Sequence, residues 1–172
     1  AILKDWKADK SWTLFLDRDG VINERIVDGY VKNVEEFIFN EGVLETIKKL
    51  SAVVGRIVVV TNQQGIGKGL MTTDDLNKVH DFMLSEIERA GGRVDNIYFA
   101  PGLASPTNEL RKPNIGMALQ AKKDFPEINF SKSVMIGDSP SDMEFGKNAG
   151  MKTIFVGKEN DLADEVIDSL KL

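Results

Sequence analysis

The chain has 172 residues, a formal net charge of −5 and no cysteine. The lack of cysteine excludes disulfides, thiolate catalysis and zinc sites that need cysteine ligands. An apolar fraction of 42% is typical of a folded protein, and the length suits one domain, residues 1–172, with its own core. The acidic balance argues against nucleic-acid binding, and no apolar stretch reaches the roughly 18 residues that a membrane helix needs. We therefore expect a cytoplasmic protein that binds neither nucleic acid nor membrane.

Short apolar runs rich in valine and isoleucine alternate along the chain with stretches of helical periodicity. The runs predict five strands, over residues 12–16, 56–61, 94–99, 133–136 and 152–155. The periodic stretches predict five helices, over residues 42–50, 72–90, 115–124, 141–149 and 161–170. This alternation predicts an α/β fold: a doubly wound, mainly parallel Rossmann-like sheet with helices on both faces.

Two stretches between these elements are too long for ordinary connections. Residues 20–41 separate the first strand from the first helix and carry several aromatic side chains, so we expect a small flap over a site. Residues 101–113 form the other long loop, in which we expect the most mobility. The glycine-rich stretch 65–69 lacks the phosphate-loop pattern, and we expect a turn there that lets the backbone approach a substrate.

The most informative motif is Asp17-Arg18-Asp19-Gly20, which directly follows the first predicted strand. The carboxyl end of a strand in an open α/β sheet is where ligands bind. Two carboxylates placed there can hold a cation, share a proton, or divide the roles of nucleophile and acid–base catalyst. From this motif alone, a surface turn that is acidic by chance remains the alternative.

Three further polar segments lie where predicted strands end or a predicted helix begins. Thr61 ends the second strand, Lys112 precedes the helix over 115–124, and a Gly-Asp-x-x-x-Asp motif places Asp138 and Asp142 after the fourth strand. Carboxylates, a hydroxyl and a lysine on one rim of a sheet suit phosphoryl transfer, in which positioning and charge neutralisation dominate. Mg²⁺ prefers oxygen ligands of this kind.

In this order, the four motifs resemble those of the haloacid-dehalogenase-like phosphatase superfamily. The resemblance implies that Asp17 is the nucleophile that forms an aspartyl-phosphate, and that Asp19 protonates the leaving group and then activates water. It implies that Thr61 hydrogen-bonds the transferring phosphoryl group and that Lys112 neutralises charge. It also implies a Mg²⁺ ion held by Asp17, the backbone carbonyl of Asp19, Asp138 and, through water, Asp142, unless Asp142 serves to orient Lys112.

Residues around the motifs narrow the resemblance. Asp28-Gly29-Tyr30-Val31, the segment 61–69 and Arg111-Lys112-Pro113 are similar to those of the D-glycero-D-manno-heptose 1,7-bisphosphate phosphatases and the related histidinol-phosphate phosphatases. These families lack a large cap domain, which implies the same here and a monomer. The implied substrate is a small phosphate ester, preferably the heptose bisphosphate, which would lose its 7-phosphate, with histidinol phosphate as the alternative. The matching substrate positions are Asp28, Gly29, Tyr30, Asn62, Gln63, Gln64 and Arg111.

The chain departs from those families in one loop. They commonly carry one histidine and three cysteines just before Arg-Lys-Pro, whereas residues 100–110 contain neither. We therefore expect Mg²⁺ but no zinc, and an altered substrate entrance. Two other functions stay open: a nucleic-acid 3′-phosphatase, because residues 58–67 also resemble the phosphatase domain of polynucleotide kinase-phosphatases, and a catalytically silent binding module.

Two interpretations stay open for Arg18, and His80 receives a structural one. In an extended backbone Arg18 points away from the acids on either side of it, and a structural ion pair explains it as well as a substrate contact does. His80, the only histidine, lies within a predicted helix far in sequence from every motif. We interpret it as a structural residue.

Overall fold

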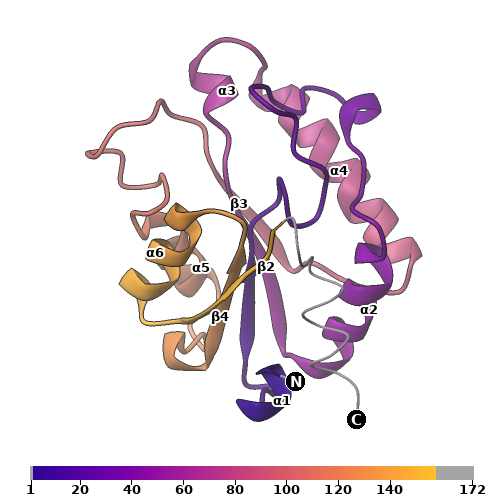
Figure 1. Ribbon diagram of the computed structural model, residues 1–172, viewed down its shortest axis with the longest axis vertical. Coiled ribbons are helices and arrows are strands. Elements are labelled where there is room, and N and C mark those ends of the chain that lie inside the picture. The colour runs from indigo at the N-terminus through magenta and orange to yellow at the C-terminus, as the bar shows by residue number, and fades with distance from the viewer. Residues whose placement is uncertain (1, 158–172) are drawn as a thin grey trace.

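The computed structural model describes residues 2–157, and the helix predicted over 161–170 lies outside them. A sheet of five parallel strands forms the centre (Figure 1), in the order β3-β2-β1-β4-β5. The predicted parallel α/β sheet is confirmed, with strand bounds that differ from the predicted ones by at most two residues. The strands are β1 (Thr13–Leu16), β2 (Arg56–Asn62), β3 (Asn96–Ala100), β4 (Ser133–Gly137) and β5 (Lys152–Phe155).

Helices cover both faces of the sheet, as predicted. In Figure 1, α2 (Val43–Val53) and α4 (Thr73–Arg89) lie on one side, and α5 (Gly116–Asp124) and α6 (Pro140–Ala149) lie on the other. The sequence analysis did not predict the short helix α1 (Ile2–Asp5). The glycine-rich stretch expected to be a turn contains one helical turn, α3 (Gln64–Gly67). Two 3₁₀ helices complete the described elements, η1 (Val34–Glu36) and η2 (Phe130–Lys132).

The continuous apolar runs in the strands are explained by two separate cores. Alternate residues of a strand point to opposite faces. Leu14 and Leu16 of β1 therefore pack in the core that contains α2 and α4, whereas Phe15 packs in the core that contains α5 and α6. All three are fully buried. The strands β1 and β4 are buried at every position, so the polar groups near them lie beyond their ends.

The strand order places β1 in the middle of the sheet. Leu16 lies opposite Val59 of β2 and Ile136 of β4. Because all strands run in the same direction, the residues after β1 and β4 and at the end of β2 meet at one edge. The predicted site residues are brought together by this register.

Helix α4 begins with a capping box. The Thr72 hydroxyl accepts a hydrogen bond from Asp75 N, and the Asp75 carboxylate accepts one from Thr72 N. The helix buries one face against the sheet, and His80 belongs to that buried face. Among the described residues, no helix is both long and apolar enough to cross a membrane.

Candidate active site

A buried lysine joins the segments at the sheet edge. Lys112 Nζ donates to Asp17 Oδ1 at 2.9 Å, to Asp142 Oδ1 at 2.7 Å and to the carbonyl of Val60 at 2.9 Å. Lys112, Asp17 and Asp142 are all buried. One ammonium therefore pairs with two carboxylates and holds both at the end of β2. The bond to Asp142 suits the second role considered for that residue, which is to orient Lys112.

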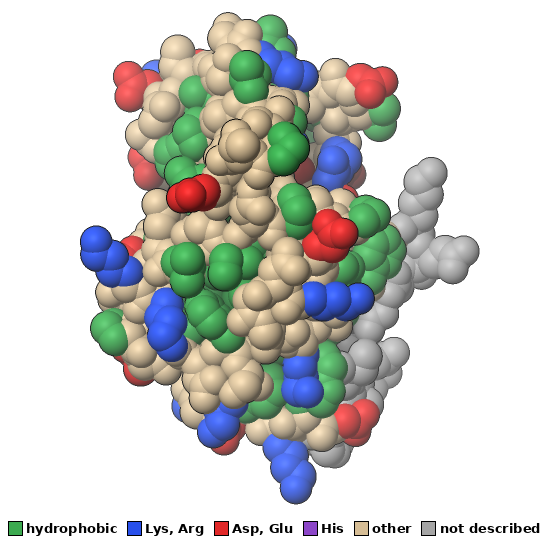
Figure 2. All heavy atoms as spheres, turned by 90° about the vertical axis from the view of Figure 1, so that its left-hand side faces the viewer, with side chains coloured by type: hydrophobic (Ala, Val, Ile, Leu, Met, Phe, Trp, Pro, Cys, Tyr) green, Lys and Arg blue, Asp and Glu red, His purple; other side chains and the backbone are tan. Residues whose placement is uncertain are grey.

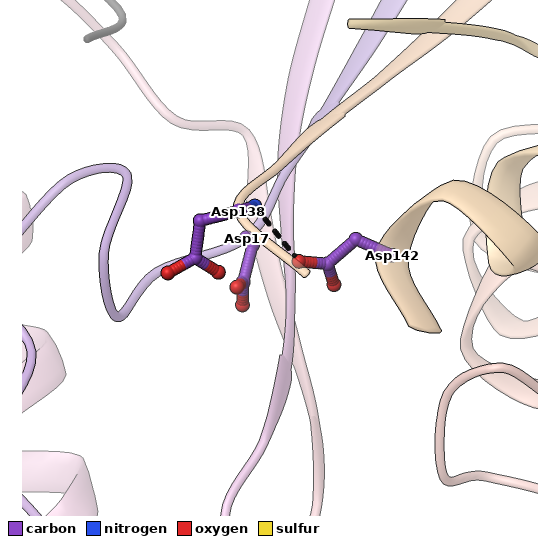
Figure 3. A group of neighbouring side chains, drawn as sticks. All are labelled: Asp17, Asp138 and Asp142. Carbon is purple, nitrogen blue, oxygen red and sulfur yellow. Dashed lines mark hydrogen bonds between the residues drawn. The ribbon is translucent and has the colours of Figure 1, made fainter. Parts of the chain in front are cut away.

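Three carboxylates form the group that could hold a metal ion. Asp17, Asp138 and Asp142 each offer an oxygen, and these oxygens all lie within 4.8 Å of one another. Figure 3 shows the Asp17 and Asp138 carboxylates side by side, with Asp142 facing them from α6. Asp138 N also donates to Asp142 Oδ2, at 3.1 Å. An all-oxygen donor set of this kind fits Mg²⁺.

Two glycines make room for these carboxylates. A Cβ atom at Gly137 would collide with the side chain of Asp142, and one at Gly20 would collide with the carboxylate of Asp138. Gly20 also has a φ of +87°, in the left-handed region that favours glycine. The backbone of both motifs therefore depends on glycine for the carboxylates to come together.

Burial and the charges of neighbouring carboxylates shift the pKa values of Asp17 and Lys112. Burial raises the pKa of Asp17 well above its usual value, and the nearby Asp142, Asp138 and Asp19 raise it further, against the opposite effect of Lys112. Burial alone would lower the pKa of Lys112, but the charges of Asp17 and Asp142 outweigh it and raise that pKa. The lysine is therefore charged, and the carboxylates favour an additional cation.

Asp19, the predicted acid–base catalyst, has three side-chain donors. Its Oδ1 accepts from Arg18 Nη2 at 2.8 Å and from Asn23 Nδ2 at 2.9 Å, and its Oδ2 accepts from Gln63 Nε2 at 3.1 Å. Burial opposes ionisation of Asp19. The charge of Arg18 and these hydrogen bonds outweigh that effect and lower its pKa. Asp19 is thus a carboxylate in the substrate-free protein.

Gln63 was expected to bind substrate, but its side chain lies in the interior, behind the pocket wall. Its side chain is buried, at 1% exposure, and besides Asp19 it donates to Thr61 Oγ1 at 2.9 Å. Gln63 is therefore a link between two predicted catalytic side chains and does not line the pocket. No periodicity or motif in the sequence distinguishes it from its neighbours Asn62 and Gln64.

The expectation that Arg18 points away from both acids is wrong. The chain turns directly after β1, and the backbone N–H groups of Val21, Ile22 and Asn23 all donate to the carbonyl of Arg18. This turn brings the guanidinium back to Asp19, in an ion pair at 2.8 Å. The extended geometry assumed for the prediction ends at Leu16.

His80 is buried and hydrogen-bonded, as expected of a structural residue, but it lies close to the site. Its Nε2 is 3.0 Å from Arg18 Nη1. Burial first, and the charge of Arg18 second, lower the pKa of His80 to about 3. Sequence distance concealed this contact, because 62 positions separate the two residues.

A pocket of about 560 Å³ opens beside Asp17, Asp19 and Lys112. Part of the predicted flap, from Arg25 to Val31, forms one wall, and the segment after β2 forms another. Six of the seven predicted substrate positions line it: Asp28, Gly29, Tyr30, Asn62, Gln64 and Arg111. Four further pocket residues were not predicted: Arg25, Lys68, Ser139 and Ser141. Arg25 lies in the flap, Lys68 in the glycine-rich stretch and the two serines at variable positions of the Gly-Asp-x-x-x-Asp motif, where the pattern does not single out a residue.

Amide side chains hold the entrance loop at residues 101–113. Asn114 Nδ2 donates to the carbonyls of Asn108 and Pro106, and Asn108 Nδ2 donates to the carbonyl of Leu103. Gln64 Oε1 accepts from Ala104 N at 2.8 Å, which ties the loop to the pocket wall. The loop thus has internal bonds in the segment where the related families carry zinc ligands.

Charged side chains are distributed over the surface without a dominant sign on the face that Figure 2 shows. On the face shown in Figure 2, Lys and Arg side chains are scattered among acidic and apolar ones. That face has no basic stripe of the kind that follows a nucleic-acid backbone.

Comparison with known proteins agrees with this geometry. A family model described as HAD-hydrolase-like matches residues 109–170. The D-glycero-alpha-D-manno-heptose-1,7-bisphosphate 7-phosphatase of Burkholderia mallei is 39% identical over 151 residues, which cover 84% of this chain and 78% of that protein. The D-glycero-beta-D-manno-heptose-1,7-bisphosphate 7-phosphatase of Rhodopseudomonas palustris is 36% identical over 156 residues, which cover 86% of this chain and 85% of that protein.

A solved structure is similar over almost the whole chain. It is the D,D-heptose 1,7-bisphosphate phosphatase from B. bronchiseptica, complexed with magnesium and phosphate. The identity is 30%, the TM-score is 0.79, and the match covers 94% of this chain and 88% of that one. Fold and site thus define a haloacid-dehalogenase-like hydrolase. More narrowly, the chain belongs to the family of the heptose-1,7-bisphosphate 7-phosphatases, which confirms the resemblance found in its motifs.

Proposed function

We propose that this chain is a Mg²⁺-dependent phosphatase that removes the 7-phosphate of D-glycero-D-manno-heptose 1,7-bisphosphate through an aspartyl-phosphate on Asp17. The observation that carries the proposal is the position of Asp17, beside the pocket and hydrogen-bonded to the buried ammonium of Lys112. Arg18 N and Lys112 Nζ both donate to Oδ1 of Asp17, so the carboxylate has a fixed orientation. A nucleophile that is already oriented needs less reorganisation during attack.

Two chemical steps follow from the arrangement. In the first, a carboxylate oxygen of Asp17 forms a bond to phosphorus while the bond from phosphorus to the sugar oxygen breaks, and Asp19 gives that oxygen a proton. In the second, Asp19 takes a proton from water, whose oxygen attacks phosphorus and releases phosphate from Asp17. Thr61 and Lys112 would donate to the phosphoryl oxygens, where charge develops.

The carboxylates of Asp17, Asp138 and Asp142, with the backbone carbonyl of Asp19, are the groups that would hold Mg²⁺. Bound there, Mg²⁺ neutralises the carboxylates and withdraws charge from the phosphoryl group. An arriving phosphate ester also adds negative charge beside Asp19, which favours the protonated form that the first step requires.

The cations of the pocket support a substrate with a second phosphate. Arg111 Nη1 is buried and has no hydrogen-bond partner among the described residues. Lys68 and Arg25 line the same pocket, and Lys68 Nζ lies 5.6 Å from the centre of the Tyr30 ring. A second phosphate would satisfy Arg111 with charge-assisted hydrogen bonds. Histidinol phosphate has no second phosphate and carries an amine and an imidazole instead, so these cations disfavour it.

The test is phosphate release, with Mg²⁺ and with excess chelator, from a panel of esters. The panel contains both anomers of the heptose 1,7-bisphosphate, histidinol phosphate, hexose monophosphates and a 3′-phosphorylated oligonucleotide. We expect a preference for a heptose bisphosphate that disappears with chelator. Preference for histidinol phosphate or the oligonucleotide would replace the substrate assignment. Inactivity toward every ester would favour the alternative function, a catalytically silent binding module.

A further inference from the structure

Three side chains connect helix α4 to the predicted acid–base catalyst. Arg18 Nη1 donates to Nε2 of His80 at 3.0 Å, and Arg18 Nη2 donates to Oδ1 of Asp19 at 2.8 Å. Arg18 is completely buried, and His80 is 6% exposed. A single guanidinium therefore joins a helix in the core to a carboxylate at the pocket.

The chemistry of the two groups fixes the form of His80. An arginine has only donors, so Nε2 of His80 must be the acceptor, and the imidazole must be neutral with its proton on Nδ1. The lowered pKa of His80 agrees with a neutral ring at pH 7. The bond is thus directional: it exists for one tautomer only.

Few other contacts hold the guanidinium of Arg18. Its Nε has no hydrogen-bond partner in the part of the chain that the structure describes. Its Cζ lies 5.7 Å from the centre of the Phe37 ring, which contacts the group without fixing its rotation. Apart from Asp19 itself, His80 is therefore the side chain seen to fix the guanidinium of Arg18 by a hydrogen bond, and Arg18 is one of the three donors that orient Asp19.

We propose that His80 is a positioning residue, which holds the guanidinium of Arg18 and through it the carboxylate of Asp19 in the orientation for proton transfer to the leaving group. This inference rests on the proposed phosphatase function. His80 does not line the pocket beside Asp17 and Lys112, and its hydrogen bond is to Arg18, through which its effect passes. A misplaced proton donor slows the release of a basic leaving group and has little effect on a leaving group that departs without a proton.

The test compares phenyl phosphate, which has a poor leaving group, with 2,4-dinitrophenyl phosphate, which has a good one. The value of kcat/KM reports the first chemical step for both. Replacing His80 by Leu removes the acceptor and keeps an apolar side chain in the core. We expect His80→Leu to lower kcat/KM roughly tenfold for phenyl phosphate and less than twofold for the dinitrophenyl ester. We expect His80→Gln, whose side-chain oxygen can accept from Arg18, to restore most of the loss.

Met83→Ala is the matched control. Met83 is a fully buried, apolar residue on the same face of α4, so its truncation destabilises the fold without removing the acceptor of Arg18. It should change kcat/KM for both esters by the same factor. An equal loss for both esters in His80→Leu, or the same selective loss in Met83→Ala, would overturn the positioning role while leaving the phosphatase in place. A wild type inactive toward both aryl esters and toward the heptose bisphosphate would instead refute the function itself.

A second measurement needs no activity. Because the chain has one histidine, its imidazole nitrogens give a single set of NMR signals. We expect a protonated Nδ1 and an unprotonated Nε2 at pH 7. A proton on Nε2 would overturn the proposal, since that tautomer cannot accept a hydrogen bond from Arg18.

Discussion

Arg25 donates to both carboxylate oxygens of Asp138, from Nε at 3.2 Å and from Nη2 at 2.9 Å. Its Nη2 also lies 3.5 Å from the backbone carbonyl of Asp19. One guanidinium thus contacts two of the groups expected to hold Mg²⁺. The Arg25 side chain is 53% exposed, so it can leave without disturbing the core.

Removal of Arg25 should strengthen Mg²⁺ binding. An exposed ion pair contributes up to about 1 kcal/mol, so Arg25→Ala should lower the Kd for Mg²⁺ by at most about fivefold. Calorimetric titration of the substrate-free protein measures this. Arg89→Ala, which breaks an exposed ion pair within α4, is the control and should leave the Kd unchanged. Weaker Mg²⁺ binding in Arg25→Ala would show that Arg25 supports the site and does not compete with the ion.

Asp17→Asn should abolish turnover and keep the fold. The amide has nearly the shape of the carboxylate but is a very poor nucleophile, so we expect kcat to fall by roughly a thousandfold or more. Phosphate release and circular dichroism measure the two effects. Asp81→Asn, an exposed change on α4, should retain full activity. Residual turnover near the wild-type rate would exclude an aspartyl-phosphate on Asp17.

Lys112→Met should destabilise the protein at pH 7. The substitution leaves Asp17 and Asp142 buried without their shared ammonium, and breaking a buried pair costs about 3–5 kcal/mol. Urea unfolding in the presence of chelator measures the free energy. Lys49→Met, an exposed change on α2, should have little effect. If Asp142→Asn recovers none of the loss in Lys112→Met, the cost does not arise from the unpaired charge.

Arg111→Met should weaken the binding of bisphosphates more than that of monophosphates. A hydrogen bond to a charged group is worth about 1.5–3 kcal/mol, so KM for the heptose bisphosphate should rise roughly ten- to hundredfold with little change in kcat. Steady-state kinetics with the bisphosphate and a hexose monophosphate measure this. The KM for the monophosphate should change far less. An equal rise for both substrates would place Arg111 at the transferring phosphate instead of the second one.

The two tyrosines should ionise in well-separated steps. Burial, followed by its hydrogen bond to Asp124 at 2.7 Å, raises the pKa of Tyr98 to about 12. The hydrogen bond from Gln64, followed by Lys68, lowers the pKa of Tyr30. Tyrosinate absorbance during a pH titration measures both, and Tyr30→Phe and Tyr98→Phe should remove the early and the late step respectively. A single step for both tyrosines would contradict these environments.

The raised pKa of Tyr98 also makes the free energy of unfolding depend on pH. Between about pH 10, the pKa of an unfolded tyrosine, and about pH 12, the folded chain keeps a proton that the unfolded chain loses. The contribution of Tyr98 is therefore complete below pH 10 and disappears as the pH rises through 12. In Tyr98→Phe, the free energy of unfolding should decrease less over this range than in the wild type.

Most of the fold was predictable because its signals are local. The apolar runs of β1, β2 and β4 are buried on both faces and contain almost no polar residue, so their pattern is strong. The capping box at Thr72 and Asp75 depends on four adjacent positions. Helix α3 was missed because a single turn is too short to show periodicity.

The predicted site depended on which residues end the strands, and this explains both its success and its errors. Asp17 and Asp138 follow strands directly, so the parallel sheet fixes where they meet. Gln63 was predicted to bind substrate, and Arg18 lies between two predicted site residues. The side-chain directions of both are set by local turns that the sequence pattern does not reveal. Arg25 and His80 reach the site from the flap and from α4, so only the packed chain could place them.

The sequence by itself determined the chemistry: which carboxylates, hydroxyl and lysine follow the strands, and the family to which their order belongs. Those features depend on short-range patterns and on the common direction of parallel strands. The tertiary structure alone decided which charges neighbour one another, from Lys112 between two aspartates to the bond from Arg18 to His80. Such contacts arise from side-chain packing between segments far apart in the chain, for which the sequence has no local signal.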